Sequence, residues 1–140
     1  AIEEERPGEV AAPSGRGETI LLVEDEAGVR AFAQRALEQA GYRVVVAEYA
    51  EAALGVADRM AQPADLLLTA LVMPGGRNGV ALAARLEARW PGLRVLLMSG
   101  YVEDEFDRHG LAASGRALLQ KPFTLAELAA RVRALLDGRA

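Results

Sequence analysis

Four side chains that could handle a phosphoryl group follow short apolar segments of this 140-residue chain. Glu24 and Asp25 place two carboxylates side by side after the first of these segments. Adjacent carboxylates repel each other unless a cation lies between them, and Mg²⁺ prefers such oxygen ligands and bridges to phosphate. The hydroxyl of Ser99 and the ammonium of Lys121, each after a later segment, suit the other phosphoryl oxygens. If these segments end at one place, the sequence predicts a site for Mg²⁺ and phosphate.

A further apolar segment, Asp65 to Met73, ends in Pro74-Gly75 and is apolar on both faces. Such a run is typical of the central strand of a parallel sheet that helices cover on each side. Ligands of open parallel sheets bind outside the carboxyl ends of the strands. We predict that this strand ends at Ala70, whose methyl group can be neither a nucleophile nor a metal ligand. The predicted site therefore lacks an atom to which phosphate could be attached.

Five predicted strands alternate with five predicted helices along the chain. The strands are Thr19–Val23, Arg43–Ala47, the segment from Asp65, Arg94–Met98 and Ala117–Gln120. The helices are about Ala27–Ala40, Ala50–Met60, Val80–Arg89, Glu103–His109 and Thr124–Asp137. Helix spacing puts Phe32 on the apolar stripe of the first helix, and Thr124 with Glu127 forms a capping box at the start of the last. This alternation predicts an α/β fold with a parallel sheet between two layers of helices.

The composition indicates one domain, which we place at residues 19–138, after a flexible acidic linker at residues 1–18. Hydrophobic residues make up 51% of the chain, yet no apolar run could span a bilayer. The chain has no cysteine, which excludes a disulfide framework. A net charge of −4 and the absence of a basic cluster argue against nucleic-acid binding. These features favour the cytoplasm and no membrane contact by this segment.

Simpler interpretations exist for some of these residues. Glu24 and Asp25 could be ordinary acids at a helix N-terminus. Ser99 could simply cap the end of a strand. Lys121 is the single lysine among sixteen cationic residues, which favours a site role because a compact ammonium fits where the arginine fork does not. The glycines after Pro74 predict a turn, since no nucleotide-loop motif follows them. His109 has the position of a structural residue.

The motifs together resemble the receiver domain of bacterial two-component response regulators. The matching segments, in the order and spacing of that family, are Leu22–Glu26, Leu67–Gly75, Asn78–Gly79, Ser99–Tyr101 and Lys121–Phe123. The resemblance is greatest to receivers at the C-terminus of hybrid sensor histidine kinases. It implies a (βα)5 flavodoxin-like, doubly wound parallel sheet with strand order 2-1-3-4-5, and a parent chain that is an ATP-dependent protein-histidine kinase.

The resemblance also implies roles for the site residues. Glu24, Asp25 and the backbone carbonyl of Val72 would hold Mg²⁺. Ser99 would bind a phosphoryl oxygen and Lys121 would pair with the phosphate. The peptide bond before Pro122 is cis in many family members.

Two positions depart from the family. The phosphoryl acceptor is an Asp where this chain has Ala70, so the chain as given should not form an aspartyl phosphate. Ala70 is either a substitution in a working receiver or the mark of a natural pseudo-receiver, and the first is favoured because only one site residue is missing. The family often has an aromatic residue at the position of Leu118, which puts coupling from the site to the surface in doubt.

Two functions follow from the resemblance. In the first, a receiver with Asp at position 70 accepts a phosphoryl group from a phosphohistidine of a histidine kinase or histidine phosphotransfer domain. In the second, the domain is a phosphorylation-independent interaction module. Its surface would be the fourth helix, the fifth strand and the fifth helix, which could bind a partner or a second copy of the chain. A nucleotide or flavin protein on the same fold is disfavoured, because the sequence has no phosphate-binding loop.

Overall fold

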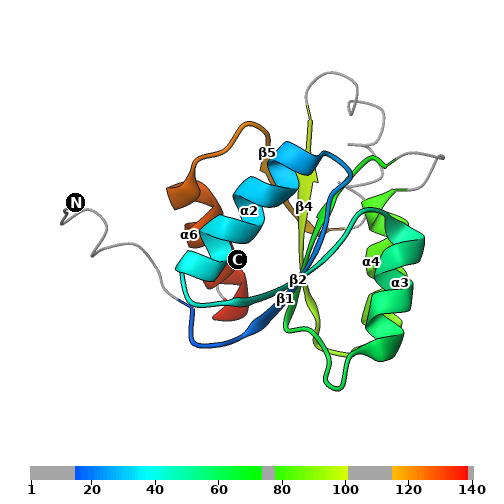
Figure 1. Ribbon diagram of the computed structural model, residues 1–140. Helices are drawn as coiled ribbons and strands as arrows, with labels where there is room; N and C mark the ends of the chain where they lie inside the picture. Colours follow the sequence, from blue (N-terminus) through cyan, green and yellow to red (C-terminus); the bar gives the residue numbers. More distant parts are fainter. Residues whose placement is uncertain (1–14, 74–77, 101–114, 139–140) are drawn as a thin grey trace.

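The computed structural model describes residues 15–73, 78–100 and 115–138, and its centre is a five-stranded sheet (Figure 1). The strands are all parallel and lie in the order β2-β1-β3-β4-β5. Their bounds are β1 Thr19–Val23, β2 Arg43–Ala47, β3 Leu66–Ala70, β4 Arg94–Ser99 and β5 Ala117–Gln120. Three strands match the predicted bounds, and β4 extends one residue further, to Ser99. The predicted order of the strands is confirmed.

Helices cover both faces of the sheet, as Figure 1 shows. The two helices on one face are α2 Ala27–Gln39 and α6 Leu125–Leu136, and the two on the other are α3 Ala50–Arg59 and α4 Gly79–Arg89. This arrangement confirms the α/β, doubly wound fold. The helix predicted at about residues 103–109 lies outside the described residues, as does His109. None of the described helices has the length and apolarity needed to cross a bilayer.

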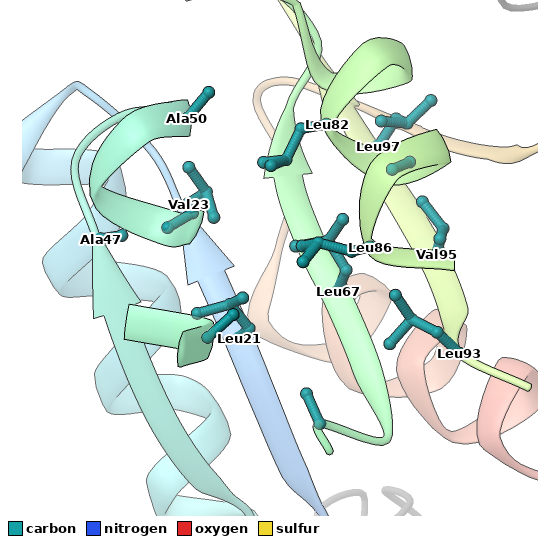
Figure 2. Packing of buried hydrophobic residues seen from close by; sticks show 14 of the residues in the cluster. Leu21, Val23, Ala47, Ala50, Leu67, Leu82, Leu86, Leu93, Val95 and Leu97 are labelled. Carbon is teal, nitrogen blue, oxygen red and sulfur yellow. The ribbon is translucent and has the colours of Figure 1, made fainter. Parts of the chain in front are cut away.

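The sequence of β3 explains its central place. All five of its residues are buried, as expected for a strand between two neighbours and two helix layers. Alternate residues point to opposite faces, so Leu67 joins the core on the α3 and α4 side, seen in Figure 2. Leu66 and Leu68 join the core under α2 and α6. Fully burying one leucine side chain stabilises the fold by about 1.5–3 kcal/mol, so this strand anchors both layers.

Side-chain caps define where two helices begin. Asn78 precedes α4, and its side-chain oxygen accepts a hydrogen bond from the Ala81 amide at 2.8 Å. Thr124 and Glu127 exchange hydrogen bonds of 3.0 and 2.8 Å at the start of α6, which confirms the predicted capping box. These caps set the points at which the chain leaves the loops after β3 and β5.

Phe32 does not lie in the core, contrary to the prediction from the apolar stripe. It is 44% exposed, because α2 buries only its narrow face of Ala33, Ala36 and Leu37. Its ring instead lies 6.1 Å, centre to centre, from the ring of Phe123 after β5. The two rings connect the start of α2 to the loop that carries Lys121.

The end of the predicted linker is held against the domain. The Gly15 amide donates to the Ala40 carbonyl at 2.5 Å, and the Gly17 amide donates to the Gly41 carbonyl at 3.0 Å. A Cβ at Gly15 would collide with the backbone of Gly41 and the ring of Tyr42, so only glycine allows this close approach. Residues 15–18 are therefore part of the folded unit, and the earlier linker residues lie outside the described ones.

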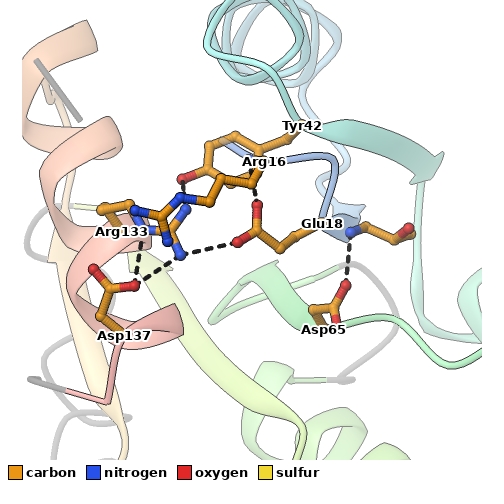
Figure 3. Close-up of polar contacts among 7 residues, drawn as sticks. Arg16, Glu18, Tyr42, Asp65, Arg133 and Asp137 are labelled. Atoms are coloured by element: carbon orange, nitrogen blue, oxygen red, sulfur yellow. Dashed lines mark hydrogen bonds and ion pairs between the residues drawn. The ribbon is translucent and has the colours of Figure 1, made fainter. Parts of the chain in front are cut away.

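A buried arginine connects α6 to residues at the amino ends of the strands (Figure 3). Arg133, 6% exposed, donates to the carboxylates of Glu18 at 2.9 Å and Asp137 at 2.8 Å and to the hydroxyl of Tyr42 at 3.4 Å. Hydrogen bonds to Asp137 and Glu18 raise the pKa of Arg133. Burial acts to raise the pKa of Glu18, but the hydrogen bonds from Arg133 and nearby amides outweigh it and lower that pKa.

Candidate functional site

The strand register brings the predicted site residues to one edge of the sheet. Ala70 pairs with Met98, and the Leu71 amide donates to the Met98 carbonyl at 2.7 Å. One strand further, the Lys121 amide donates to the Ser99 carbonyl at 2.8 Å. Glu24 directly follows β1, which lies on the other side of β3. The carboxyl ends of four strands therefore converge as predicted.

Glu24 and Lys121 form an ion pair at this edge. The Lys121 Nζ lies 3.1 Å from Glu24 Oε1 and 3.2 Å from Glu26 Oε1. The other oxygen of Glu24, Oε2, accepts a hydrogen bond from the Glu26 amide at 3.0 Å. Glu24 is fully buried, while the Glu26 side chain is 62% exposed. The lysine therefore joins one buried and one exposed carboxylate.

Burial and pairing shift both titrating groups of this ion pair. Burial raises the pKa of Glu24 above its ordinary value, although the Glu26 amide and the Lys121 ammonium oppose that rise. Burial alone would lower the pKa of Lys121, but the carboxylates of Glu24 and Glu26 outweigh it and raise that pKa. The ammonium is thus held in its charged form, beside a carboxylate for which ionisation is costly.

One buried polar atom at this edge lacks a partner. The Ser99 hydroxyl has no hydrogen-bond partner among the residues that the structure describes, whereas the buried Glu24 Oε1 is paired with the Lys121 ammonium at 3.1 Å. An unsatisfied buried polar group costs about 1–3 kcal/mol. Such a cost is typical of a position where a ligand supplies the missing partner.

A cavity of about 220 Å³ opens at the end of β3. It is lined by Asp25, Glu26, Ala70, Val72, Met98, Gly100 and Lys121. Four of the six predicted site residues therefore border one cavity, and Glu24 reaches it through its contact with Lys121. The methyl group of Ala70, 1% exposed, stands where the strand ends. The cavity lining consequently includes two carboxylates and an ammonium, but no nucleophile at the end of β3, where Ala70 stands.

Sequence reasoning missed three residues that build this edge. Glu26 is the second partner of Lys121, and its place in the run Glu24-Asp25-Glu26 was the available signal. Arg30 on α2 donates to the Glu24 carbonyl at 2.8 Å, for which the sequence carries no signal. Gly79 was assigned to a turn and to a family motif, but its packing role was not foreseen: a Cβ there would collide with the Ala70 carbonyl oxygen and the Leu97 side chain. It allows α4 to begin directly against the end of β3.

A second hollow, of about 390 Å³, adjoins the cavity on the α2 side. Its lining is mostly apolar and includes Val29, Phe32, Pro122 and Phe123, with Lys121 shared between the two spaces. The peptide bond between Lys121 and Pro122 is cis, as the resemblance implied. The lysine therefore lies where the polar and apolar spaces meet.

The residues present fit a divalent cation in part. The cavity is lined by the carboxylates of Asp25 and Glu26 and by the Lys121 ammonium, and the buried Glu24 is paired with that ammonium behind them. The buried Glu24 Oε1 is a further candidate ligand. In the described ranges no three acidic, His or Cys side chains are arranged to hold a metal ion. The Val72 carbonyl would have to complete the set.

Leu118, where the family often has an aromatic residue, is partly buried on β5. It packs against the hydrophobic core on the α3 and α4 side. Its side chain is therefore engaged in packing, away from the ion pair at Glu24.

Known proteins share both the sequence pattern and the fold. The family model for the response regulator receiver domain matches residues 20–133. Sensor kinase CckA of Brucella abortus (strain 2308) is 35% identical over 133 residues, which are 95% of this chain and 14% of that protein. Response regulator receiver protein CpdR of the same organism is 32% identical over 117 residues, which are 84% of this chain and 95% of that protein.

A solved structure is also similar to this chain in sequence and fold. The crystal structure of the receiver domain from hybrid histidine kinase CckA has a TM-score of 0.69 and 32% identity, and the match covers 84% of this chain and 98% of that one. The chain spans only a seventh of the full-length sensor kinase that it resembles, but nearly all of the stand-alone receiver protein. From its sequence, its fold and its relatives, this chain belongs to the response regulator receiver family.

Proposed function

We propose that this domain is a phosphorelay receiver that docks with a histidine kinase or a histidine phosphotransfer domain but cannot itself accept the phosphoryl group. One observation carries the proposal: Ala70 occupies the end of β3 beside Asp25 and Lys121, where a phosphoryl acceptor would have to stand. A methyl group has no lone pair with which to attack phosphorus. The remaining groups can position and neutralise a phosphoryl group, which are the main contributions of a protein to this chemistry.

The other residues have separate tasks in this proposal. Mg²⁺ would be held by Glu24, Asp25 and the Val72 carbonyl, and when bound it would neutralise phosphoryl oxygens. The Ser99 hydroxyl, which is buried and has no partner among the described residues, would donate to one such oxygen. The Lys121 ammonium would pair with another. All of these groups could act on a phosphoryl group held by an acceptor at position 70.

The test is phosphoryl uptake from acetyl phosphate in the presence of magnesium chloride. We expect no uptake by the chain as given, and uptake of about one equivalent by Ala70→Asp. The control is Ala70→Asn, which has the size of Asp without a nucleophilic carboxylate and should remain unlabelled. Uptake by the chain with Ala70, or no uptake by a folded Ala70→Asp protein, would contradict the proposal.

The parent protein is proposed to be a hybrid sensor histidine kinase of the cytoplasm. The support is the match to a sensor kinase over 95% of this chain and to the receiver domain of a hybrid kinase. The activity of such a parent would be ATP-dependent histidine phosphorylation in a separate domain. A histidine kinase core encoded ahead of this segment is the expected finding, and a stand-alone receiver gene would contradict it.

A second candidate function is interaction without phosphorylation. It is supported by Lys121, whose ammonium already contacts two carboxylates of the chain itself, and by the exposed apolar hollow beside Phe32. The surface predicted for self-association includes β5 and α6, while its remaining helix lies outside the described residues. The test is sedimentation of this chain and of Ala70→Asp with acetyl phosphate. Self-association that is the same in both would support this function, and association only after phosphorylation would contradict it.

A further inference from the structure

The segment just ahead of β1, residues 15–18, supplies hydrogen bonds that the end of α2 needs. Carbonyl groups in the last turn of a helix have no partner within the helix. The Gly15 amide donates to the Ala40 carbonyl at 2.5 Å. The Gly17 amide donates to the Gly41 carbonyl at 3.0 Å. Both acceptors directly follow α2, so residues 15–18 close the carboxyl end of that helix.

The same four residues are attached to α6 (Figure 3). Arg133, in the last turn of α6, donates to Glu18 Oε2 at 2.9 Å. The other carboxylate oxygen of Glu18 accepts a hydrogen bond from the Arg16 amide at 2.6 Å. The Arg133 side chain is only 7% exposed, and removing one partner of an ion pair shielded from water is costly. Residues 15–18 therefore bridge the carboxyl ends of α2 and α6.

The opposite ends of these two helices lie beside the cavity. α2 begins at Ala27, directly after the acidic run, and α6 begins at Leu125, shortly after Lys121. The ring of Phe32 on α2 lies 6.1 Å, centre to centre, from the ring of Phe123 just ahead of α6. Both helices cover the same face of the sheet (Figure 1). They are thus connected by two aromatic rings at the cavity end and bridged by residues 15–18 at the far end.

We propose that residues 15–18 are a strap that joins the carboxyl ends of α2 and α6, so that the chain entering the domain and these two helices move as one body. The composition alone favoured a flexible linker up to residue 18. A strap with two attachments is cooperative, because after the loss of one attachment the other must offset the whole conformational entropy of the segment. The proposal does not depend on phosphoryl transfer, so a failure of the uptake experiment would leave it standing.

Amide hydrogen exchange, followed by NMR in ¹⁵N-labelled protein, is the first test. In the unaltered chain we expect the amides of Gly15 and Gly17 to exchange at least about tenfold more slowly than in an unfolded chain. In Gly15→Ala the added Cβ would lie 2.8 Å from the Gly41 backbone and the Tyr42 ring, which should displace the strap. The Gly17 amide should then exchange about tenfold faster. The amide of Asp137, at the end of α6, should also exchange faster, because the strap no longer holds that helix.

The matched control is Gly28→Ala in the first turn of α2, where an added Cβ would meet no atom of the described residues within 4 Å. It should change the exchange of the Gly17 and Asp137 amides less than about twofold. Exchange of the Gly15 and Gly17 amides at the rate of an unfolded chain would overturn the proposal. An unchanged Asp137 amide in Gly15→Ala would also overturn it, because the strap would then not reach α6.

A nitroxide label provides the second test, because the chain has no cysteine and a single one can be introduced. Arg16 is exposed, and a label on Arg16→Cys should show only the slow motion of the whole domain in its electron paramagnetic resonance spectrum. Glu18→Ala removes the attachment to α6, and in that background the spectrum should gain a mobile component. A label on Arg35→Cys, exposed on α2, is the control and should not respond to Glu18→Ala. A label at residue 16 that is already mobile in the otherwise unaltered chain would contradict the strap.

The third test is a double-mutant cycle of Gly15→Ala and Glu18→Ala in urea unfolding. If either change releases the whole strap, the double variant should lose less unfolding free energy than the sum of the two single losses. Additive losses would mean that the two attachments act separately, and the proposal would fail. If Gly15→Ala proves unfolded by circular dichroism, amide exchange in the unaltered chain and in Glu18→Ala decides the question.

Discussion

The two ends of the sheet both carry a buried ion pair, but they satisfy it differently. At the amino ends of the strands, Arg133 is bonded to Glu18, Asp137 and Tyr42 (Figure 3). At the carboxyl ends, Glu24 Oε1 is paired with Lys121, the Ser99 hydroxyl has no hydrogen-bond partner among the described residues, and a cavity opens there. The first end is closed, and the second retains an unsatisfied group that a ligand could use.

The difference shows that the polar groups that stabilise the fold and those that border the cavity lie at opposite ends of the sheet. A buried arginine whose hydrogen bonds are made within the chain holds secondary structure together, and nothing is gained by opening it. A buried hydroxyl without a hydrogen bond costs stability, and among the described residues Ser99 at the carboxyl ends of the strands is such a group. Substitutions at both ends of the sheet test this contrast.

Removing the arginine should have the largest effect. Arg133→Met leaves Glu18, Asp137 and Tyr42 without their shared donor, and we expect the free energy of unfolding in urea to fall by about 3 kcal/mol. The control is Arg131→Met on the same helix, which should cost less than about 0.5 kcal/mol. Similar losses for the two variants would mean that the hydrogen bonds of Arg133 to Glu18, Asp137 and Tyr42 do not stabilise the fold.

Gly79→Ala tests the packing that shapes the site end. The added methyl group would collide with the Ala70 carbonyl oxygen and the Leu97 side chain, and we expect a loss of about 2 kcal/mol in urea unfolding. Gly55→Ala on α3 is the matched control, because the nearest atom to its added Cβ is an arginine nitrogen 3.8 Å away. There the higher helix propensity of alanine should stabilise the protein by about 0.5–1 kcal/mol. A neutral Gly79→Ala would show that α4 can move away from β3.

Ala70→Asp tests the charge balance of the cavity. In EDTA we expect this variant to be less stable than the chain as given by about 1 kcal/mol, because a further carboxylate is brought close to those of Glu24 and Asp25. Ala70→Asn separates charge from size and should lose less. Magnesium chloride should restore the Asp variant and bind it more tightly than the chain with Ala70. Equal magnesium affinity for the two proteins would argue against a metal ligand at position 70.

The smallest effect concerns the pH dependence at the closed end. Because the pKa of Glu18 is lower in the folded protein than its ordinary value, its pairing with Arg133 stabilises the fold fully above the ordinary pKa. That stabilisation is lost as the pH falls through the lowered pKa. Glu18→Gln should therefore be less stable by under about 1 kcal/mol at pH 7, and the difference should vanish in acid. A difference that stays constant down to pH 2 would rule out ionisation as its cause.

The strands and their order were predictable, because short continuous apolar runs are local signals and their alternation with helices predicts a parallel sheet. The bounds of β1, β2 and β5 agree with the prediction, and the other elements within the described residues differ by about one residue at their ends. The convergence of Glu24, Ala70, Ser99 and Lys121 followed from the rule that parallel strands end at one edge. Their assigned roles in metal and phosphate binding remain predictions.

The remaining features depend on contacts between distant residues, which periodicity does not reveal. Arg133 received no role from the sequence, since nothing in α6 indicates that it meets Glu18 from 115 positions earlier. Phe32 fitted the apolar stripe of its helix and is nevertheless exposed beside Phe123. Lys121 was assigned to phosphate alone, because the sequence does not say how close Glu24 and Glu26 would lie.

The anchoring of residues 15–18 has a mechanical consequence. Glu18 and Glu24 bracket β1, so the strand's length of about 17 Å separates the point where the chain enters the domain from the cavity. The chain therefore enters the described part of the domain at the edge of the sheet opposite the cavity, where Gly15 and Gly17 are hydrogen-bonded to residues 40 and 41 and Glu18 is paired with Arg133 of α6. A force applied to the chain at Gly15 would act on these contacts and on β1 before it reached the cavity.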